Sequence, residues 1–310
     1  MLDVRHRYDC PLRWGDQDLF HHVNNVRYVD YLQEARGALL RACLEAAGVE
    51  RGEGDGYVVV RHEVSFRAPL KFRKPTVAIE SWVSEVRAAG FTLDHEIFHD
   101  TDEGRVVYLR ARTVLAPFVV ATGTARRLSD LERAALEPYR EDGERSLPLR
   151  TAVPRDRAGH YPVHVRFSDL DVYRHVNNVM YYEYFQEARI ALMRDLAPAL
   201  KQFGRIAVVV AQGDVEYHAP MTLRHEPYDC WTSVSRVGSR SMTVDSEIVD
   251  PTGATGRDGV VARGRFVLVF FDLETERSVS PPEGYGEAIQ RAVAALGGAE
   301  HAALAVELAE

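Results

Sequence analysis

The strongest constraint on the fold of this chain is an internal duplication. Residues 13–36 read RWGDQDLFHHVNNVRYVDYLQEAR and residues 166–189 read RFSDLDVYRHVNNVMYYEYFQEAR, so each position of the first copy matches the position 153 residues further on. The identical polar pairs include Asp16/Asp169, Asp18/Asp171, His22/His175, Asn24/Asn177, Asn25/Asn178 and Glu34/Glu187. A repeat of this kind predicts two homologous halves, each with a polar loop that leads into a helix.

Length and composition allow two small globular domains. With 310 residues, of which 46% are hydrophobic, each half can build its own core. Acidic residues outnumber basic residues by 46 to 38, which gives a formal net charge of -8. We therefore expect neither nucleic acid nor a membrane surface as a partner.

The sequence shows no segment typical of secretion or membrane insertion. The first residues, MLDVRHRYDCPLRWGD, lack the apolar stretch of a secretory signal, and no run of about 20 apolar residues follows. We expect a cytoplasmic protein. Cys10, Cys43 and Cys230 occupy unrelated repeat positions without a C-x-x-C pair, which predicts buried thiols rather than disulfides or a zinc site.

Each copy predicts a short strand, the polar loop and a long helix. The two strands are expected at residues 8–14 and 161–167. The helices are indicated by apolar side chains three and four residues apart, which form one stripe. The first stripe consists of Tyr28, Leu32, Ala35, Leu39, Cys43 and Ala46, with Gly48 expected at the helix end. The second consists of Tyr181, Phe185, Ala188, Leu192 and Leu196, and Pro198 limits its length.

Strands dominate the rest of each half. Alternating or continuous apolar residues predict strands at residues 57–70, 77–86, 91–100 and 110–118 in the first half, and at 207–221 and 263–271 in the second. A strand, a helix and several strands joined by short turns form an α+β pattern, in which an antiparallel sheet covers a single helix.

The sequence between and after the two halves predicts the domain boundaries. Ser129 begins an S-D-L-E capping box for a short helix that ends at Pro138. We expect an N-terminal domain at 1–140, a linker at 141–158, a C-terminal domain at 159–285 and an accessory helical tail at 286–310. The tail has a short apolar stripe of Ile289, Val293 and Leu296.

A carboxylate in a loop that runs into a helix suggests attack on a carbonyl group. The carboxylate can act as a nucleophile or deprotonate a water molecule, while amides at the helix start stabilise the developing oxyanion. Loss of one oxyanion donor typically raises the barrier by about 2.7–4 kcal/mol. A thioester suits this simple arrangement because the thiolate is a good leaving group.

The duplicated motif resembles that of the hotdog-fold acyl-CoA thioesterases of the 4-hydroxybenzoyl-CoA thioesterase type. The matching pattern is R-[WF]-[GS]-D-x-D-x-x-x-H-V-N-N-x-x-Y, followed by E-A-R, and the likeness covers nearly all of both halves. The resemblance implies two hotdog domains in tandem, each a long helix wrapped by an antiparallel sheet. It further implies that they pair as an intramolecular pseudo-dimer with up to two active sites.

The resemblance also implies roles for individual residues. Asp18 and Asp171 would be the catalytic carboxylates, and the amides near Asn25 and Asn178 would polarise the thioester carbonyl. The water, the carboxylate or the acyl group would be oriented by His22, His175, Asn24 and Asn177. Substrate contacts are further expected from Tyr28, Tyr181, Glu34 and Glu187.

A second resemblance leaves the carrier of the acyl group open. The second half is also similar to the plant acyl-carrier-protein thioesterases, which are themselves tandem hotdog proteins. Those enzymes typically place Asn two residues after the Asp, where this chain has Phe20 and Tyr173. The substrate can therefore be an acyl-CoA or an acyl carrier protein.

Structural interpretations compete with several of these roles. Asp16 and Asp169 are expected to bond in turns or caps, and Asn24 and Asn177 can be plain N-caps. Glu34 and Glu187, with Arg36 and Arg189, are expected by default in solvated or inter-half ion pairs, although a helix glutamate is catalytic in other hotdog branches. The tyrosines at 28 and 181 can simply line the core. The cations Arg67, Lys71, Arg73 and Lys74 could hold CoA phosphates, but exposed charges usually face water.

These observations predict hydrolysis of acyl-CoA to a free acid and CoA, without a metal or a cofactor. One alternative is a hotdog enoyl-CoA hydratase or dehydratase in which His22 or His175 is the base. Another is a non-catalytic acyl-CoA-binding module. The acyl chain, the activity of each half and any further association of chains stay open.

Overall fold

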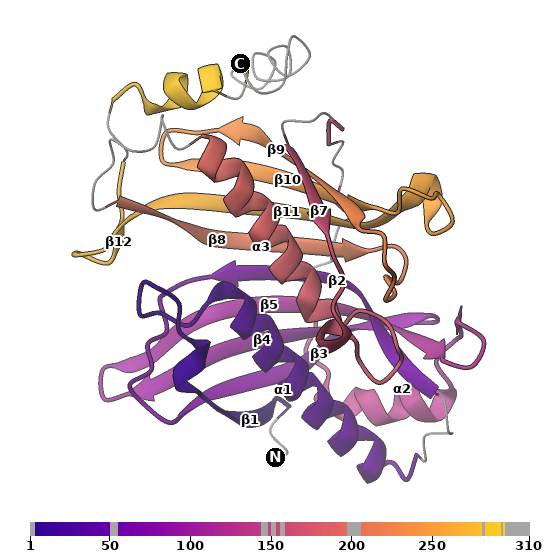
Figure 1. The fold of residues 1–310 in the computed structure, drawn as a ribbon. Helices are drawn as coiled ribbons and strands as arrows, with labels where there is room; N and C mark the ends of the chain where they lie inside the picture. Colours follow the sequence, from indigo (N-terminus) through magenta and orange to yellow (C-terminus); the bar gives the residue numbers. More distant parts are fainter. Residues whose placement is uncertain are drawn as a thin grey trace. The chain divides into compact units, whose positions relative to one another are not determined.

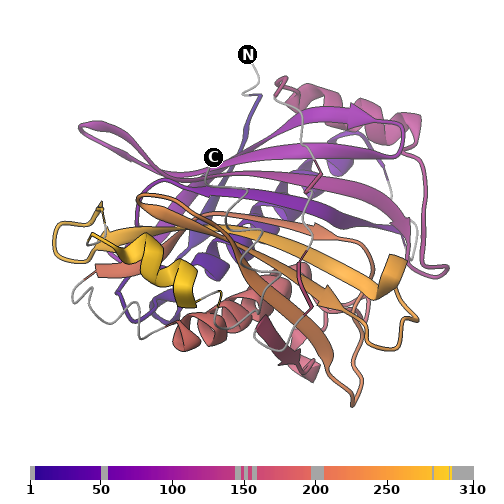
Figure 2. The same cartoon turned by 90° about the horizontal axis from the view of Figure 1, so that it is seen from above.

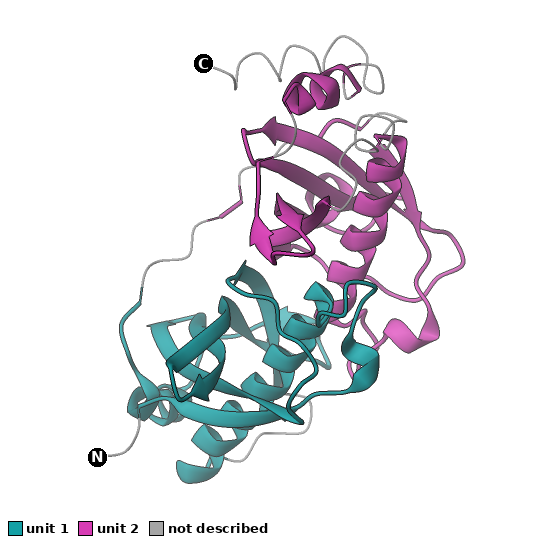
Figure 3. Ribbon diagram, turned by 90° about the vertical axis from the view of Figure 1, so that its left-hand side faces the viewer, with its two compact units in different colours: residues 1–147 teal, residues 148–310 magenta. Residues whose placement is uncertain are grey.

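A computed structural model describes residues 4–49, 55–143, 148–149, 153–155, 159–196, 206–280, 283–292 and 294. The chain divides into two compact units, 1–147 and 148–310 (Figure 3). This division falls inside the segment 141–158, which the sequence predicts as a linker.

Unit 1 is a long helix against an antiparallel sheet (Figure 1). The helix is α1 (Asn25–Ala46), and the strands are β1 (His6–Pro11), β2 (Asp55–Phe66), β3 (Thr76–Arg87), β4 (Gly90–Thr101) and β5 (Gly104–Val119). Their order is β1-β3-β4-β5-β2, and a two-residue strand, β6 (Thr124–Ala125), extends β5. All of these pairs are antiparallel, as the α+β pattern predicts.

The sequence explains where α1 begins and ends. Asn24 is its N-cap, because the side-chain oxygen accepts a 2.9 Å hydrogen bond from the Val26 N–H. At the other end Gly48 has φ of +63°, a left-handed conformation that glycine adopts readily. The predicted stripe is buried from Tyr28 to Cys43, whereas Ala46 at its end is exposed. Its C-terminal part joins Val83, Leu93 and Leu115 in the core.

Unit 2 repeats this arrangement (Figures 1 and 2). It contains α3 (Asn178–Asp195), β7 (His160–Val163), β8 (Ile206–Tyr217), β9 (Tyr228–Val237), β10 (Ser241–Val249) and β11 (Val260–Asp272). The strand order is β7-β9-β10-β11-β8, again antiparallel, and β12 (Arg277–Ser278) pairs with β11. Pro198, which the sequence predicts to limit the length of α3, lies outside the described residues.

The first strand of each unit is shorter than the sequence predicts. β1 ends at Pro11 because Trp14–Asp16 forms a 3-10 turn in which the Asp16 carboxylate accepts a 2.8 Å hydrogen bond from the Arg13 N–H. The equivalent turn in unit 2 is Phe167–Asp169. β5 in contrast extends well beyond the predicted range 110–118.

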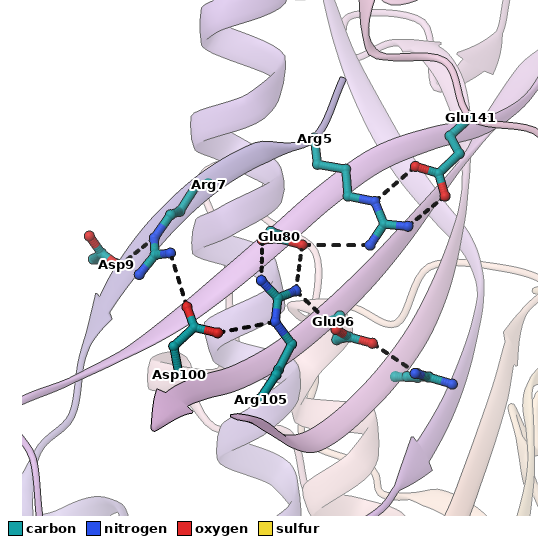
Figure 4. A network of polar contacts seen from close by, with 9 residues as sticks. Arg5, Arg7, Asp9, Glu80, Glu96, Asp100, Arg105 and Glu141 are labelled. Atoms are coloured by element: carbon teal, nitrogen blue, oxygen red, sulfur yellow. Dashed lines mark hydrogen bonds and ion pairs between the residues drawn. The ribbon is translucent and has the colours of Figure 1, made fainter. Parts of the chain in front are cut away.

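The face of the unit 1 sheet opposite α1 carries a network of ion pairs (Figure 4). Side chains alternate along β3, so Ile79 and Ser81 are fully buried while Glu80 between them points to the other face. The Arg105 guanidinium contacts the carboxylates of Glu80, Glu96 and Asp100 at 2.8–3.2 Å. The outer face is therefore held by paired charges, and Arg105 also stacks 3.5 Å from the centre of the Phe98 ring.

The described parts of the predicted linker bind to the sheets. Glu141 forms a bidentate pair with Arg5, and its N–H donates to the Val83 carbonyl at 3.0 Å. In unit 2, Arg155 pairs with Glu247 at 3.0 Å. Residues 144–147, 150–152 and 156–158 of this segment lie outside the described residues.

Two helical segments predicted outside the repeats are present. α2 (Asp130–Leu136) has the predicted capping box between Ser129 and Glu132, with hydrogen bonds of 2.8 and 3.1 Å. Residues 285–292 are helical and bury Ile289, whereas Val293 and Leu296 of the predicted stripe lie outside the described residues.

The three cysteines are buried free thiols, as predicted. None of the helices in the described ranges has the length and apolar character needed to cross a bilayer.

Candidate active site

The D-x-D loop of unit 1 is a small hairpin closed on itself. The Asp18 N–H donates to the His22 carbonyl at 2.8 Å, and the His21 N–H donates to the Asp18 carbonyl at 3.1 Å. The Asp18 Oδ1 atom accepts a 2.9 Å hydrogen bond from the Phe20 N–H, which forms an Asx turn. His21 has φ of 59°, so a non-glycine residue takes the left-handed conformation at the turn.

The loop of unit 2 contains the same hydrogen bonds. Asp171 exchanges the same backbone bonds with His175 and Arg174, at 2.9 and 3.0 Å, and its Oδ1 accepts from the Tyr173 N–H at 2.9 Å. Arg174 occupies the left-handed position with φ of 62°. The duplication therefore extends from the sequence to the conformation of the loop.

One oxygen of each second aspartate remains available. The only hydrogen bond from the described residues to the carboxylates of Asp18 and Asp171 is the Asx-turn bond to Oδ1. Both side chains are half-buried. The Oδ2 atoms can therefore accept a proton or attack a substrate without breaking a structural bond.

The first aspartate of each motif anchors the loop instead. Asp16 is 6% exposed, and its Oδ2 accepts hydrogen bonds from the Tyr31 hydroxyl at 2.6 Å and from the Arg13 N–H. Asp169 has the same two bonds, from Tyr184 and Arg166, and also a bond from the Arg166 guanidinium at 3.0 Å.

The polar bonds to Asp169 also set its ionisation. Burial alone would raise its pKa, but the hydrogen bonds from Tyr184 and Arg166 outweigh it and hold the pKa below the usual range. Asp169 thus stays ionised, with its lone pairs already used. The structural role expected for the first aspartate of each motif is confirmed.

The helix starts lie directly after the loops. Asn24 caps α1, and Asn177 caps α3 through a 2.9 Å bond from the Val179 N–H. The Asn25 N–H donates no hydrogen bond to any described residue. It is one of the unpaired amides at the positive end of the helix dipole.

A segment far along the chain completes the site. Leu70, which follows the Ala-Pro pair, accepts a 2.8 Å hydrogen bond from the Val23 N–H and donates one of 3.0 Å to the Tyr28 hydroxyl. Met221 makes the equivalent bonds with Val176 and Tyr181. Burial raises the pKa of both tyrosines, which therefore stay protonated. Tyr28 and Tyr181 are thus buried, and their hydroxyls join each helix to the segment after the Ala-Pro pair.

Two other predicted pairs of residues lie differently. His22 and His175 are half-buried, and their backbone carbonyls accept the hydrogen bonds that close the loop hairpins. Glu34 and Glu187 are exposed, nine residues beyond the helix start, or about 14 Å at 1.5 Å per residue.

The expectation that the helix arginines are solvated is wrong. Arg36 and Arg189 are only 9% and 6% exposed because they face the sheet. Burial lowers the pKa of Arg189 to about 10, and its guanidinium lies 5.0 Å from the Phe266 ring centroid.

The surroundings of these arginines differ between the halves, which the sequence interpretation missed. In unit 1 a fully buried chain of hydrogen bonds runs from Ser81 through His95 and Thr113 to His62, at 2.8, 3.2 and 3.1 Å. By strand register the counterparts are Thr232, Ser246, Phe266 and Gly213. The signal available in the sequence was a polar residue at a core-facing position in each of four strands.

Comparisons with known proteins agree with the geometry. The model of the Thioesterase-like superfamily matches residues 12–142 and 165–292, once in each half. The structure is similar to a protein from Lactobacillus plantarum assigned as an oleoyl thioesterase, with a TM-score of 0.67, 14% identity, and coverage of 90% of this chain and 97% of that one.

A second solved structure has the same TM-score. It is the 12:0-ACP thioesterase from Umbellularia californica, with 17% identity over 87% of this chain and 99% of that chain. Among curated proteins, the uncharacterized protein YsmA from Bacillus subtilis (strain 168) is 33% identical over 82 residues, 26% of this chain and 54% of YsmA. The likeness to the solved structures confirms the predicted tandem hotdog fold.

Proposed function

This chain belongs to the thioesterase-like superfamily, and we propose that it hydrolyses acyl-CoA to a free acid and CoA, with Asp18 and Asp171 as the catalytic carboxylates. The observation that carries the proposal is the contrast within each D-x-D motif. The first aspartate is buried and accepts hydrogen bonds from a tyrosine hydroxyl and a backbone amide, whereas the second is half-buried beside the start of a helix and accepts only the Asx-turn bond from the described residues.

The proposed chemistry uses the second aspartate as a general base. The Asp18 carboxylate takes a proton from water as the water oxygen attacks the thioester carbonyl. The resulting oxyanion accepts a hydrogen bond from the Asn25 N–H, at the positive end of α1. Collapse of the tetrahedral intermediate breaks the carbon–sulfur bond and releases the CoA thiolate, which recovers the proton.

Direct attack by the carboxylate is the variant of this mechanism that the geometry also allows. An acyl-aspartyl anhydride would form, and water would then hydrolyse it. Hydrolysis in H₂¹⁸O during a single turnover separates the two routes. Attack by water on the thioester labels only the acid. After attack by the carboxylate, water that opens the anhydride at the aspartyl carbonyl labels Asp18 and leaves ¹⁶O from Asp18 in the acid, so label in Asp18 identifies this route.

The remaining predicted residues support the site in this proposal. His22 and His175 orient the loop or the attacking water, and Asn24 and Asn177 fix the first turn of each helix. Tyr28 and Tyr181 line the wall of the acyl site. We assign Glu34 and Glu187 no contact with the reacting group, because each lies nine residues beyond the start of its helix.

The acyl group can be carried by CoA or by an acyl carrier protein. One solved relative is named for its 12:0-ACP substrate, which keeps an acyl carrier protein as an alternative to CoA. Two alternatives belong to other functional classes. One is an enoyl-CoA hydratase or dehydratase with His22 or His175 as the base, and the other is a non-catalytic acyl-CoA-binding module.

A panel of saturated, unsaturated and aromatic acyl-CoAs tests the proposal. Free thiol is recorded with a thiol reagent, and the absorbance of enoyl-CoA is followed in parallel. We expect thiol release with at least one panel member and no change in the enoyl chromophore. Enoyl turnover without thiol release would identify a hydratase, and saturable binding without either change would identify a binding module.

A further inference from the structure

Three large apolar side chains of unit 1 are exposed around the D-x-D loop. Trp14 and Leu19 in the loop are 78% and 81% exposed, and Phe72 is 39% exposed. The segment that contains Phe72 is bonded to the residues just before the loop, because the Leu12 N–H donates to the Pro75 carbonyl at 2.8 Å. Large exposed apolar groups that gather beside a polar site are typical of a binding surface.

Cations flank these side chains. Arg67, Arg73 and Lys74 are exposed, and none of their side chains forms an ion pair or hydrogen bond with another described residue. The Arg73 charge lies close enough to Tyr108 to oppose the rise in the tyrosine pKa that burial causes. Arginines on the outer face of the same unit, such as Arg105, are fully engaged with carboxylates.

The equivalent surface of unit 2 carries its cations differently. Phe167, Val172 and Leu223 repeat the exposed apolar positions, at 81%, 91% and 48%. The counterpart of Arg73 is Arg224, but its guanidinium is bound to Asp250 at 2.7 Å and stacked 3.5 Å from the centre of the Tyr228 ring. The cation that follows the Ala-Pro segment is therefore engaged in unit 2 and available in unit 1, whereas the exposed cation of the unit 2 loop is Arg174.

We infer that the surface formed by Trp14, Arg67, Arg73 and Lys74, here called the rim, binds the phosphorylated adenine nucleotide of CoA. The inference rests on the proposed function, since it places the carrier of the thioester beside the Asp18 loop. Trp14 offers a face for the adenine ring, as aromatic side chains do for nucleic acid bases. Arginine and lysine donors match the diphosphate and the 3′-phosphate.

Binding can be measured without turnover. Trp14 is the one highly exposed tryptophan of three, since Trp82 lies under Arg5 at 3.9 Å and Trp231 lies against His160 at 4.6 Å. Titration with CoA should quench the Trp14 fluorescence, and pantetheine, which lacks the nucleotide, should not. The apparent Kd for CoA should rise with salt, because the contact is between charges.

Substitution of the rim tests its role in hydrolysis. We expect Arg73→Ala with Lys74→Ala to lower kcat/KM for acyl-CoA by about tenfold relative to kcat/KM for the matching acyl-pantetheine, as for the loss of about 1.4 kcal/mol of binding. Trp14→Ala should lower the same ratio. The matched control in unit 2, Phe167→Ala with Leu223→Ala, should leave the ratio unchanged.

The outcomes separate this inference from the proposed function. If CoA neither quenches Trp14 nor loses affinity in the Arg73→Ala/Lys74→Ala variant, the rim does not bind the nucleotide. If these variants slow the hydrolysis of an acidic acyl carrier protein substrate but not of acyl-CoA, the rim docks a protein instead. Normal CoA binding without hydrolysis of any thioester would overturn the proposed function alone.

Discussion

The Tyr31 hydroxyl donates a 2.6 Å hydrogen bond to the buried Asp16 carboxylate, and Tyr184 repeats this bond with Asp169. A hydrogen bond to a charged group typically contributes about 1.5–3 kcal/mol. We expect Tyr31→Phe to lower the free energy of unfolding by an amount in that range.

Tyr184→Phe should cost less, because the Arg166 guanidinium also contacts Asp169. Urea unfolding of the two variants at neutral pH measures both values. An equal loss in the two variants, or no loss in either, would show that this bond does not anchor the loops.

Asn24 should act as a helix cap rather than as a catalyst. Its side-chain oxygen is engaged with the Val26 N–H, so Asn24→Ala should cost about 1 kcal/mol of stability. Asn24→Ser keeps a capping oxygen and should retain stability. In that serine variant kcat should fall by less than tenfold, against about 10²–10⁴ for loss of a general base. A larger fall in kcat with normal stability would place Asn24 in the chemistry.

The buried histidines of unit 1 should make the protein less stable in mild acid. Burial, with the Arg36 charge adding to it, lowers the pKa of His95 to about 3 and places that of His62 well below 6.5. Below pH 6.5 the unfolded chain binds protons that the folded chain does not, so stability falls as pH falls. Each histidine contributes a slope of up to about 1.4 kcal/mol per pH unit between the unfolded and folded pKa values.

Carboxylates act in a separate pH window. The carboxyl of Glu132 has a folded pKa of about 2, which follows from its bonds to Arg126, Tyr57 and Ser129 despite its burial. Its contribution to stability is lost only below about pH 4.5. Urea midpoints at pH 7.5, 6.0 and 5.0 therefore report mainly on histidines. In His95→Gln the decline over this range should become shallower, and an unchanged decline would contradict the assignment.

Arg189 should contribute little to stability. Its Nη1 atom is buried without a hydrogen-bond partner among the described residues, and burial lowers its pKa. A buried charge without such a partner is often replaced by an apolar side chain at no cost. We expect Arg189→Met to leave the free energy of unfolding unchanged or to raise it.

Arg265 is the matched control for this substitution. It is bound to the buried Asp245 at 2.8 and 3.1 Å, so Arg265→Met should cost about 2 kcal/mol or more because a buried carboxylate loses its partner. Thermal or urea unfolding of both variants measures the difference. A strong loss in Arg189→Met would mean that its stacking on Phe266 is a major interaction.

Much of the fold could be predicted because its signals are local. The helix from Asn25 to Ala46 follows from an N-cap, a stripe and a glycine, and α2 follows from its capping box. The duplication then extended the same assignment to α3. The role of Asp16 was also predictable, since an aspartate before a helix commonly bonds in a turn or cap.

The missed features depend on contacts between distant segments. Nothing in the spacing of His62 and His95 indicates that Thr113 links them across three strands. The contact of Leu70 with the D-x-D loop likewise depends on sheet register, as does the burial of Arg36. Burial of a helix arginine is unusual enough that the ordinary preference for solvent led to the wrong expectation.

The roles of Asp18 and Asp171 are tested most directly by kcat for acyl-CoA hydrolysis in Asp18→Asn, Asp171→Asn and the double variant. Asparagine keeps the Oδ1 acceptor of the Asx turn, so urea midpoints should match the wild type. We expect the double variant to lose about 10²–10⁴-fold in kcat, as for removal of a general base. A folded double variant with the wild-type kcat would contradict the catalytic role of Asp18 and Asp171.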